Sequence, residues 1–520
     1  GLGNTPEIFQ HSFYYGYDQR ELANEYRPLA SLLFALEYSG FGKTAAGYHG
    51  VSILLYLLLL WLIYRFVKEL LNQEAAFWTA LLFAMMPVHS EVVLNVKAQD
   101  DLLLGVFFFA SLTLLMKQSY WSGLAYMGAL FSKELALPLI AVFPALDWYL
   151  GRKLNLKLVA VLGIPAVIYG VARLSVLEGS PEVEVVNNAL AFADGYGTQS
   201  AMGFAFLFHY IKLLLLPYPL SWDYSYNHFE LHGWMNIESL AGLVLFLGAI
   251  YWIIRKRKNP DVYSWLLLFF LISIFLFLQL IVLIEATFAE RFLFIPSFAL
   301  ALYLGVVADK RKWIPGAYGV LILLWGGLVL NRIPDWKSNR SLFEADLEKV
   351  PNSIRANTAL AYAWYEAAIA TETYDENLLN QSAELFRTAI NIYGNDAATW
   401  YNYGMTNLAL GDYTMAELCF KDCLRLRPNH TLAFNNLGNI QYLKGEHEQA
   451  KMYYALAIQA DAKNAEAWSN LGAEYLLFKQ NDSAFYALEM AVQLDPGNEN
   501  AAYNRDVARK RLGLTPSSGQ

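Results

Sequence analysis

Cysteine and charged residues are both scarce in this chain of 520 residues. Only two cysteines occur, Cys419 and Cys423, which is too few for a disulfide framework. We expect both to pack in a helix core, where small apolar side chains fit. Charged residues make up 16% of the chain and the net charge is −8, so no basic stripe is present to bind nucleic acid. These shortages exclude a disulfide-stapled domain and a nucleic-acid-binding protein.

Several motifs of soluble enzymes are also missing. The sequence has no glycine-rich phosphate loop, no Cys/His metal cluster and no nucleophile elbow. His89 has no companion metal ligands, so we expect it to form hydrogen bonds rather than to bind a metal. The chain opens on polar and aromatic residues instead of a secretory signal peptide, and we expect the natural protein to carry a further N-terminal segment.

Hydrophobic residues make up 56% of the chain and dominate residues 1–331. The uncharged run from Trp265 to Ile284 is long enough to cross a bilayer core of about 30 Å at about 1.5 Å per residue. Similar runs recur, which predicts a polytopic integral membrane protein. About ten crossings are expected, near residues 45–64, 74–88, 101–116, 119–132, 134–150, 156–174, 237–254, 263–282, 292–308 and 313–331.

Basic residues predict the orientation of these crossings. Lys and Arg fall on alternate loops, and cytoplasmic loops are the ones enriched in these residues. Both ends of the bundle are then expected outside the cytoplasm. The apolar stretch from Ala201 to Leu216 breaks the alternation, so we expect an interfacial or re-entrant helix there. The basic loops contain Arg65 and Lys68, Lys117, Arg152 to Lys157, Arg255 to Lys258, and Lys310 to Lys312.

The C-terminal third contains an internal repeat of 34 residues, which is the period of tetratricopeptide repeats. An irregular repeat from about Ser353 precedes the regular ones. Each helix pair leaves an apolar face that its neighbour must cover, so we expect an α-solenoid whose concave surface binds peptides or proteins. Two positions define the period, one occupied by Trp400, Phe434 and Trp468 and the other by Gly404, Gly438 and Gly472.

The two halves together predict an all-α protein, a polytopic membrane helical bundle followed by a tetratricopeptide-repeat α-solenoid. The stretch that joins them is too polar to cross a membrane and is expected to be a linker. We therefore divide the chain into a membrane domain at residues 1–331, a linker at 332–351, a solenoid at 352–512 and a tail at 513–520.

Ionisable residues gather in the loops predicted on the outer face. Such residues are costly at the mouth of a membrane bundle, so a functional role is their default interpretation, although any one of them can be a satisfied ion pair or a snorkelling side chain. Four cations could converge on a phosphate or pyrophosphate: Arg27, Lys97, Lys133 and Arg291. Four carboxylates could act as bases or hold those cations: Glu91, Asp100, Asp101 and Glu134. Tyr26, His89, Asp223, Tyr224 and Glu290 are expected to support this site.

An ordered set of motifs resembles the transmembrane and tetratricopeptide-repeat (TMTC) O-mannosyltransferases and their bacterial relatives. The resemblance runs through nearly the whole chain and implies a GT-C type membrane fold. The motifs are YRPL at 26–29, MPVHSE at 86–91, NVKAQDDLL at 95–103, LFSKE at 130–134, LLLLPYPLSWDYS at 213–225 and AERFLFIPS at 289–297.

The resemblance implies transfer of a sugar from a polyprenyl-phosphate carrier to Ser or Thr hydroxyls of proteins outside the cytoplasm. A carboxylate would deprotonate the acceptor hydroxyl while Arg and Lys stabilise the departing lipid phosphate. The repeats would hold the acceptor polypeptide. We expect a bacterial inner-membrane protein with its repeats in the periplasm. No cofactor is expected beyond the lipid-linked donor, and a divalent-metal requirement stays open.

Two other functions compete with transfer. A non-catalytic scaffold would recruit envelope proteins through the repeats, and two departures from the family favour it. The family's acidic catalytic motif is expected in an outer loop that precedes this sequence, with Asp18 the only aspartate before the first predicted crossing, and a basic residue is usual where Gln99 stands. A transporter would place ionisable residues along several spans, whereas the apolar runs here are mostly free of them.

Overall fold

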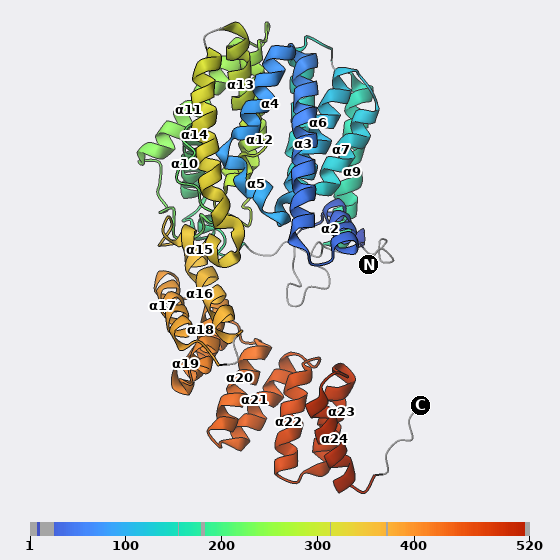
Figure 1. Cartoon of the computed structure of the whole chain (residues 1–520), viewed down its shortest axis with the longest axis vertical. Helices are drawn as coiled ribbons and strands as arrows, with labels where there is room; N and C mark the ends of the chain where they lie inside the picture. The colour runs from blue at the N-terminus through green and yellow to red at the C-terminus, as the bar shows by residue number, and fades with distance from the viewer. Residues whose placement is uncertain are drawn as a thin grey trace. The chain divides into compact units, whose positions relative to one another are not determined.

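The computed structural model describes residues 8–10, 25–153, 155–177, 183–311, 314–370 and 373–514. Every regular element in these residues is helical (Figure 1). The all-α class predicted from the sequence is therefore confirmed. Contacts divide the chain into two compact units, Gly1–Pro351 and Asn352–Gln520.

The first unit is a bundle of helices of very different lengths (Figure 1). Its α-helices are α2 (Pro28–Phe41), α3 (Ala45–Leu70), α4 (Gln73–Met85), α5 (Ser90–Leu94), α6 (Gln99–Met116), α7 (Trp121–Ser132), α8 (Val142–Tyr149), α9 (Leu156–Val176), α10 (Tyr196–Leu215), α11 (Ile237–Arg255), α12 (Val262–Ile274), α13 (Ser297–Lys310), α14 (Ile314–Arg332) and α15 (Asn339–Leu347).

Among the described residues, five helical stretches are long and apolar enough to cross a membrane: Ala45–Leu70, Val96–Met116, Leu156–Val176, Ile237–Arg255 and Gly316–Lys337. The count rises to six if α4 and the segment Pro87–Leu94, bent by 60° relative to each other, form one span. Four of the remaining predicted crossings coincide with shorter elements. The helices α7, α12 and α13 have 12, 13 and 14 residues. At about 1.5 Å per residue they are about 20 Å long, shorter than a bilayer core of about 30 Å. Residues 134–150 form two short turns and α8, and the ten crossings stay a prediction.

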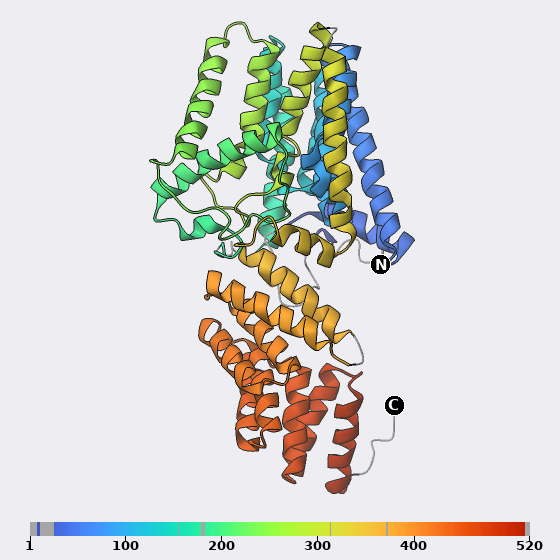
Figure 2. The same cartoon turned by 60° about the vertical axis from the view of Figure 1, so that its left-hand side comes forward.

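The helix α10 runs obliquely across the long helices of the bundle (Figure 2). It contains the stretch that we expected to be interfacial or re-entrant. With 20 residues it is long enough for a span, but it is not apolar enough to be one of the candidate spans. Gly242 of α11 lies so close to α10 that a Cβ atom there would be 1.8 Å from the carbonyl oxygen of Phe204. Glycine is therefore required at this crossing.

The basic loops meet at one end of the bundle. Lys117 pairs with Glu69 at 3.2 Å, and Arg152 donates a hydrogen bond to the carbonyl of Met116 at 2.9 Å. These groups lie at the C-terminal end of α6, a helix of 18 residues whose first turn carries two aspartates. At about 1.5 Å per residue, α6 separates the basic end from the acidic end by about 27 Å.

The stretch predicted to be a linker is folded. It forms the 3₁₀ helix η9 (Ile333–Lys337) and then α15. A capping box made by Ser338 and Ser341 fixes the start of α15. By its contacts this stretch belongs to the first unit, which extends to Pro351.

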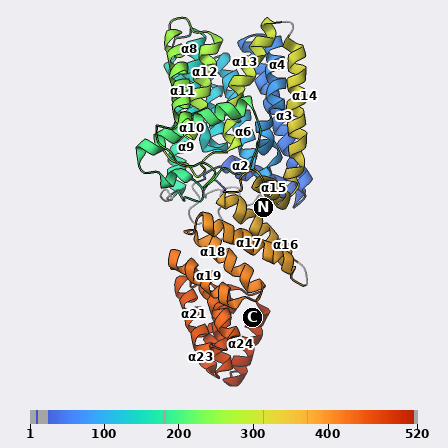
Figure 3. The same ribbon diagram turned by 90° about the vertical axis from the view of Figure 1, so that its left-hand side faces the viewer.

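The second unit is a stack of antiparallel helix pairs (Figure 3). Its helices are α16 (Ile354–Ile369), α17 (Glu376–Ile392), α18 (Ala397–Ala409), α19 (Tyr413–Leu426), α20 (Thr431–Leu443), α21 (His447–Ala460), α22 (Ala465–Leu477), α23 (Asn481–Leu494) and α24 (Glu499–Arg511).

The repeated glycines let the two helices of each pair touch. At Gly404, a Cβ atom would lie 2.7 Å from the ring of Phe420. The same contact recurs between Gly438 and Tyr454 and between Gly472 and Leu488. In α19, both cysteines are buried free thiols, as expected for core residues. Burial raises the pKa of each thiol to about 12.

Candidate active site

Arg27 is the centre of an ion-pair network at the start of α2. It donates to Glu134 through two nitrogens, Nη2 at 2.5 Å from Oε1 and Nε at 3.0 Å from Oε2. Its Nη1 lies 2.7 Å from Asp100 and 3.0 Å from Glu25. A planar guanidinium suits such bidentate pairing, whereas an ammonium group would act as a single point charge.

Lys133 extends this network along α6. Its Nζ lies 2.7 Å from Asp101 and 3.3 Å from Asp100. The two aspartates occupy the first turn of α6, where the helix dipole favours negative charge. Lys133 directly follows α7, which packs against α6, so the helix pair brings the cation to the aspartates.

Arg291 and Glu91 form a second ion pair beside the first network. Arg291 lies in the 3₁₀ helix η8 (Glu290–Leu293), and its Nη1 is 2.6 Å from Oε1 of Glu91. Its backbone N–H donates to the other carboxylate oxygen at 3.2 Å. The carboxylate of Glu91 is thus held at both oxygens.

The four predicted cations differ in their access to solvent. The side chains of Arg27 and Lys133 are only 8% and 7% exposed, whereas that of Arg291 is 29% exposed. Lys97 is exposed in the 3₁₀ helix η3 (Val96–Ala98) and lies within electrostatic range of Asp100 and Arg291. The fold therefore brings the predicted charged residues together, but it buries two of the cations among carboxylates.

The side chains of His89 and Tyr26 both form hydrogen bonds. The two ring nitrogens of His89 lie 3.0 Å from the hydroxyl of Tyr56 and 2.8 Å from that of Ser297. The Tyr26 hydroxyl donates to the carbonyl of Phe9 at 3.0 Å. No group of three or more His, Cys, Asp or Glu side chains in the described parts of the chain is placed to hold a metal.

Gln99 contacts α2 and α3 from a fully buried position. Its amide donates to Glu37 at 2.9 Å and to Ser52 at 3.1 Å. Gln99 and Asp18 are the two residues in which the sequence departs from the family pattern. Asp18 lies outside the described residues.

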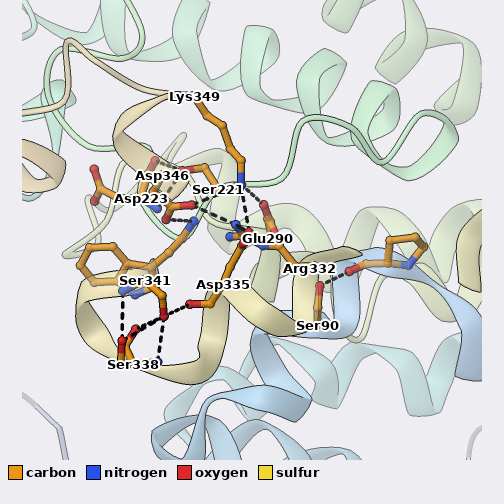
Figure 4. Close-up of polar contacts among 12 residues, drawn as sticks. Ser90, Ser221, Asp223, Glu290, Arg332, Asp335, Ser338, Ser341, Asp346 and Lys349 are labelled. Carbon is orange, nitrogen blue, oxygen red and sulfur yellow. Dashed lines mark hydrogen bonds and ion pairs between the residues drawn. The ribbon is translucent and has the colours of Figure 1, made fainter. Parts of the chain in front are cut away.

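Glu290 belongs to another polar network, shown in Figure 4. Its Oε1 accepts hydrogen bonds from the Tyr224 hydroxyl at 2.9 Å and from the backbone N–H of Ser221. Burial raises the pKa of Glu290 to about 8, and nearby Arg332 partly opposes this rise. Asp223 folds back within its own turn instead, accepting a hydrogen bond from the Ser225 hydroxyl at 2.7 Å.

Asp346 of α15 joins this network from the folded linker (Figure 4). Its Oδ2 accepts from the backbone N–H of Trp222 at 2.6 Å, and its Oδ1 lies 3.0 Å from Nη1 of Arg332. The same nitrogen is 2.8 Å from Asp335. These contacts tie α15 to the loop that carries Asp223 and Tyr224.

Our sequence predictions missed Glu25, Arg332 and Asp346. Glu25 directly precedes the YRPL motif at 26–29, so extending that motif by one residue toward the N-terminus would have included it. The other two lie in or next to the polar stretch that we expected to be a linker. Their ion pair joins the end of α14 to α15, 14 residues further on, and shows that this stretch folds.

Two family models match separate parts of the chain. Residues 27–173 match the model described as Dolichyl-phosphate-mannose-protein mannosyltransferase. Residues 367–495 match the model described as Cilia and flagella-associated protein 70 middle TPR-like domain. The first match begins at Arg27 and contains most charged residues of the two ion-pair clusters. Only Glu25 and Arg291 of those clusters lie outside it.

The curated relatives are TMTC-family protein O-mannosyltransferases, which confirms the resemblance found in the motifs. Protein O-mannosyl-transferase F38B6.6 of Caenorhabditis elegans is 24% identical over 344 residues, covering 64% of this chain and 49% of the relative. Protein O-mannosyl-transferase TMTC3 of Mus musculus is 22% identical over 489 residues, covering 81% and 52%. The chain thus spans about half the length of these relatives. Among solved structures, the TPR protein YrrB is 17% identical, with a TM-score of 0.28 over 39% of this chain and 97% of YrrB.

Proposed function

We propose that this protein transfers a sugar from a polyprenyl-phosphate carrier to Ser or Thr hydroxyls of proteins on the non-cytoplasmic side of a membrane. The observation that carries the proposal is the ion-pair network of Arg27, Asp100, Lys133 and Glu134 at the end of the bundle opposite the basic loops. Support comes from the mannosyltransferase family model, whose match contains this network, and from the O-mannosyltransferase relatives.

The donor phosphate is best assigned to Arg291 and Lys97. Arg27 and Lys133 are almost fully buried and each contacts two or more carboxylates, so a phosphate would have to displace existing partners there. Arg291 and Lys97 are the more accessible cations of the cluster. We therefore assign Arg27 and Lys133 the role of positioning the carboxylates rather than of binding the donor.

Asp101 is the best candidate for the general base. In the described part of the chain its carboxylate makes one charged contact, with Lys133. Asp100 pairs with two cations, Glu134 accepts two hydrogen bonds from the Arg27 guanidinium, and Glu91 accepts one from the Arg291 guanidinium and one from its backbone N–H. A carboxylate that accepts fewer such contacts has its charged form less stabilised and is the stronger base. Asp101 would take the proton of the acceptor hydroxyl as its oxygen attacks the anomeric carbon of the sugar.

The leaving group is the lipid phosphate. As the bond from the anomeric carbon to the acceptor oxygen forms, the bond to the phosphate oxygen breaks and its electron pair stays on the phosphate. Arg291 and Lys97 would stabilise this added charge, which is greatest in the transition state and in the product. The solenoid is proposed to hold the acceptor polypeptide, and the membrane is proposed to be a bacterial inner membrane with the repeats in the periplasm.

Transfer by the purified full-length protein tests this proposal. The assay uses polyprenyl-phosphate mannose labelled in the sugar and a Ser/Thr-rich peptide as acceptor. Loss of a general base lowers rates by about 10²–10⁴-fold, so Asp101→Asn should lower kcat within that range. Arg291→Ala should also abolish most transfer. Arg65→Ala is the matched control, because the Arg65 side chain is 43% exposed and its contacts are a 3.7 Å ion pair with Glu69 and a cation–π contact with Trp61, both far from the proposed site. Transfer that is unaffected by Asp101→Asn and Arg291→Ala would refute the assigned site.

A non-catalytic scaffold is the second candidate. It is favoured by the burial of Arg27 and Lys133 among carboxylates, which is also what a purely structural ion network would show. In that case no labelled peptide would form with any donor, and the full-length protein would still bind partners through its repeats.

A further inference from the structure

A cavity of about 290 Å³ lies in the first unit, next to the proposed site but lined by other residues. One wall comes from residues Leu94–Val96, between α5 and η3. Residues of η9 and of the start of α15 also line the cavity, together with Trp222. The residue that follows Val96 is Lys97, so the cavity borders the proposed donor site.

Three half-buried aromatic rings form the apolar part of the cavity: Trp222, Trp336 and Phe343. The rings of Trp222 and Phe343 pack against each other with centroids 5.2 Å apart. The guanidinium of Arg332 lies 5.8 Å from the ring centroid of Trp336 and orients it from one face. Aromatic rings placed in this way offer flat apolar faces and, in tryptophan, an N–H group at the edge.

Buried ion pairs fix these rings. Asp346 accepts a hydrogen bond from the backbone N–H of Trp222 at 2.6 Å and one from Arg332 at 3.0 Å. Figure 4 labels Asp346 and Arg332 in this network. The indole N–H of Trp336 is buried and has no hydrogen-bond partner in the part of the chain that the structure describes.

Hydrogen-bond donors surround the rings. Asn95, Lys337 and Asn339 line the cavity together with His49, and none of the described lining residues is a carboxylate. A cationic ligand is therefore disfavoured, because aromatic sites for cations rely on nearby negative charge. An aliphatic side chain would leave these amide groups without partners. A neutral ligand rich in oxygen atoms, with one apolar face, matches both parts of the cavity.

We propose that this cavity binds one hexose unit, such as a sugar already attached to an acceptor protein. With about 290 Å³, the cavity is large enough for one hexose ring of roughly twelve non-hydrogen atoms. The apolar C–H face of the ring would stack on an indole, and the hydroxyl oxygens would accept from Asn95 and Asn339. This site is separate from the proposed transfer chemistry, because a bound sugar here need not react.

Saturation-transfer NMR on the full-length protein in detergent micelles, with methyl α-mannopyranoside as the probe, tests the inference. Saturable binding is expected with the unaltered protein. Asn339→Ala should weaken it about fivefold or more through one lost hydrogen bond, and Trp336→Ala should abolish it. Asn339 is exposed in the first turn of α15, so its replacement keeps the fold. Asn377→Ala, at an exposed asparagine in the first turn of α17, is the matched control and should bind as the unaltered protein does.

The outcomes separate this inference from the proposed function. Methyl mannoside has no phosphate leaving group, so it reports the cavity and not transfer. Arg291→Ala should bind the probe normally while failing to transfer sugar. No saturable binding, or binding that both cavity variants leave unchanged, would overturn the inference. Binding of a tryptophan-containing peptide in place of the sugar would also overturn it.

Discussion

The guanidinium of Arg291 lies 2.6 Å from the carboxylate of Glu91, although 200 residues separate them in the sequence. The carboxylate is 1% exposed and the guanidinium 29% exposed. One partner is thus committed to the interior while the other reaches the surface, which is the arrangement expected of a cation that is held in place and still available to a ligand.

Removing one partner of this pair should destabilise the protein. In Arg291→Ala the buried Glu91 loses its counter-charge, and because Arg291 is partly exposed we expect a loss of about 2–3 kcal/mol, below the usual range for fully buried pairs. Thermal unfolding in detergent measures the change. The double variant Glu91→Gln/Arg291→Gln should regain most of the stability and none of the transfer activity. Equal stability of the single and double variants would contradict the pairing.

Arg27→Lys should harm both stability and transfer. A lysine cannot reproduce the two-nitrogen contact with Glu134 while also reaching Asp100. We expect a loss of about 1–2 kcal/mol in unfolding free energy, because charge-assisted hydrogen bonds are lost in a buried site. Transfer should fall at least about tenfold, since a misplacement of about 1 Å lowers rates severely. Arg65→Lys, at an exposed contact of 3.7 Å, is the control and should change stability by less than about 0.5 kcal/mol.

The stability of the first unit should depend on the ionisation of Glu290. Its pKa is raised to about 8 in the folded protein by burial. An ordinary glutamate, as in the unfolded chain, has a pKa of about 4.3. Between these values the folded state binds one more proton than the unfolded state, so stability falls as the pH rises from about 4.3 to about 8. Unfolding temperatures measured from pH 5 to pH 9 should show this decline.

Glu290→Gln provides the control for this pH dependence. Glutamine resembles the protonated acid, so the variant should lose the part of the decline that belongs to Glu290. Relative to the unaltered protein it should gain stability steadily as the pH rises to 8. Parallel curves for the two proteins would show that Glu290 titrates normally.

Two glycines of α11 give a matched test of the packing between α10 and α11. A Cβ atom at Gly242 would meet the Phe204 carbonyl oxygen at 1.8 Å, whereas at Gly248 nothing lies within 4 Å. Gly242→Ala should therefore destabilise the protein by about 1–3 kcal/mol or more through overpacking. Gly248→Ala should be neutral or stabilising by about 0.5–1 kcal/mol, because alanine favours a helix over glycine. Equal unfolding temperatures would show that α10 does not lie against α11 in this way.

Periodic patterns predicted most of the fold. The 34-residue spacing of Gly404, Gly438 and Gly472 located the helix pairs, because each glycine is needed where two helices touch. The apolar runs located the long candidate spans, because a helix that crosses a membrane must be apolar along its length. The folded stretch from Ile333 to Leu347 was missed because it is polar on average. Its structure depends on a few buried ion pairs, such as Arg332 with Asp346, which composition does not reveal.

The candidate site was predicted by residue type but not by pairing. Charged residues in loops near apolar runs identified Arg27, Lys133 and Arg291. Their partners lie up to 200 residues away, and which carboxylate meets which cation is decided by how the helices pack. The difference in access between Arg27 and Arg291 depends on the same packing. It could not be predicted from the sequence, and it is what separates the proposed positioning cation from the proposed donor-binding one.

Mass spectrometry of glycoproteins in cells that carry or lack this gene is the most direct measurement of the proposed transferase activity. The deletion strain is complemented with the full-length gene or with its Arg291→Ala variant, and hexose-modified Ser and Thr sites are counted in the envelope fraction. Transfer predicts that a set of modified sites disappears on deletion, returns with the unaltered gene and stays absent with Arg291→Ala. Identical modification in all of these strains would contradict the transferase and favour the scaffold.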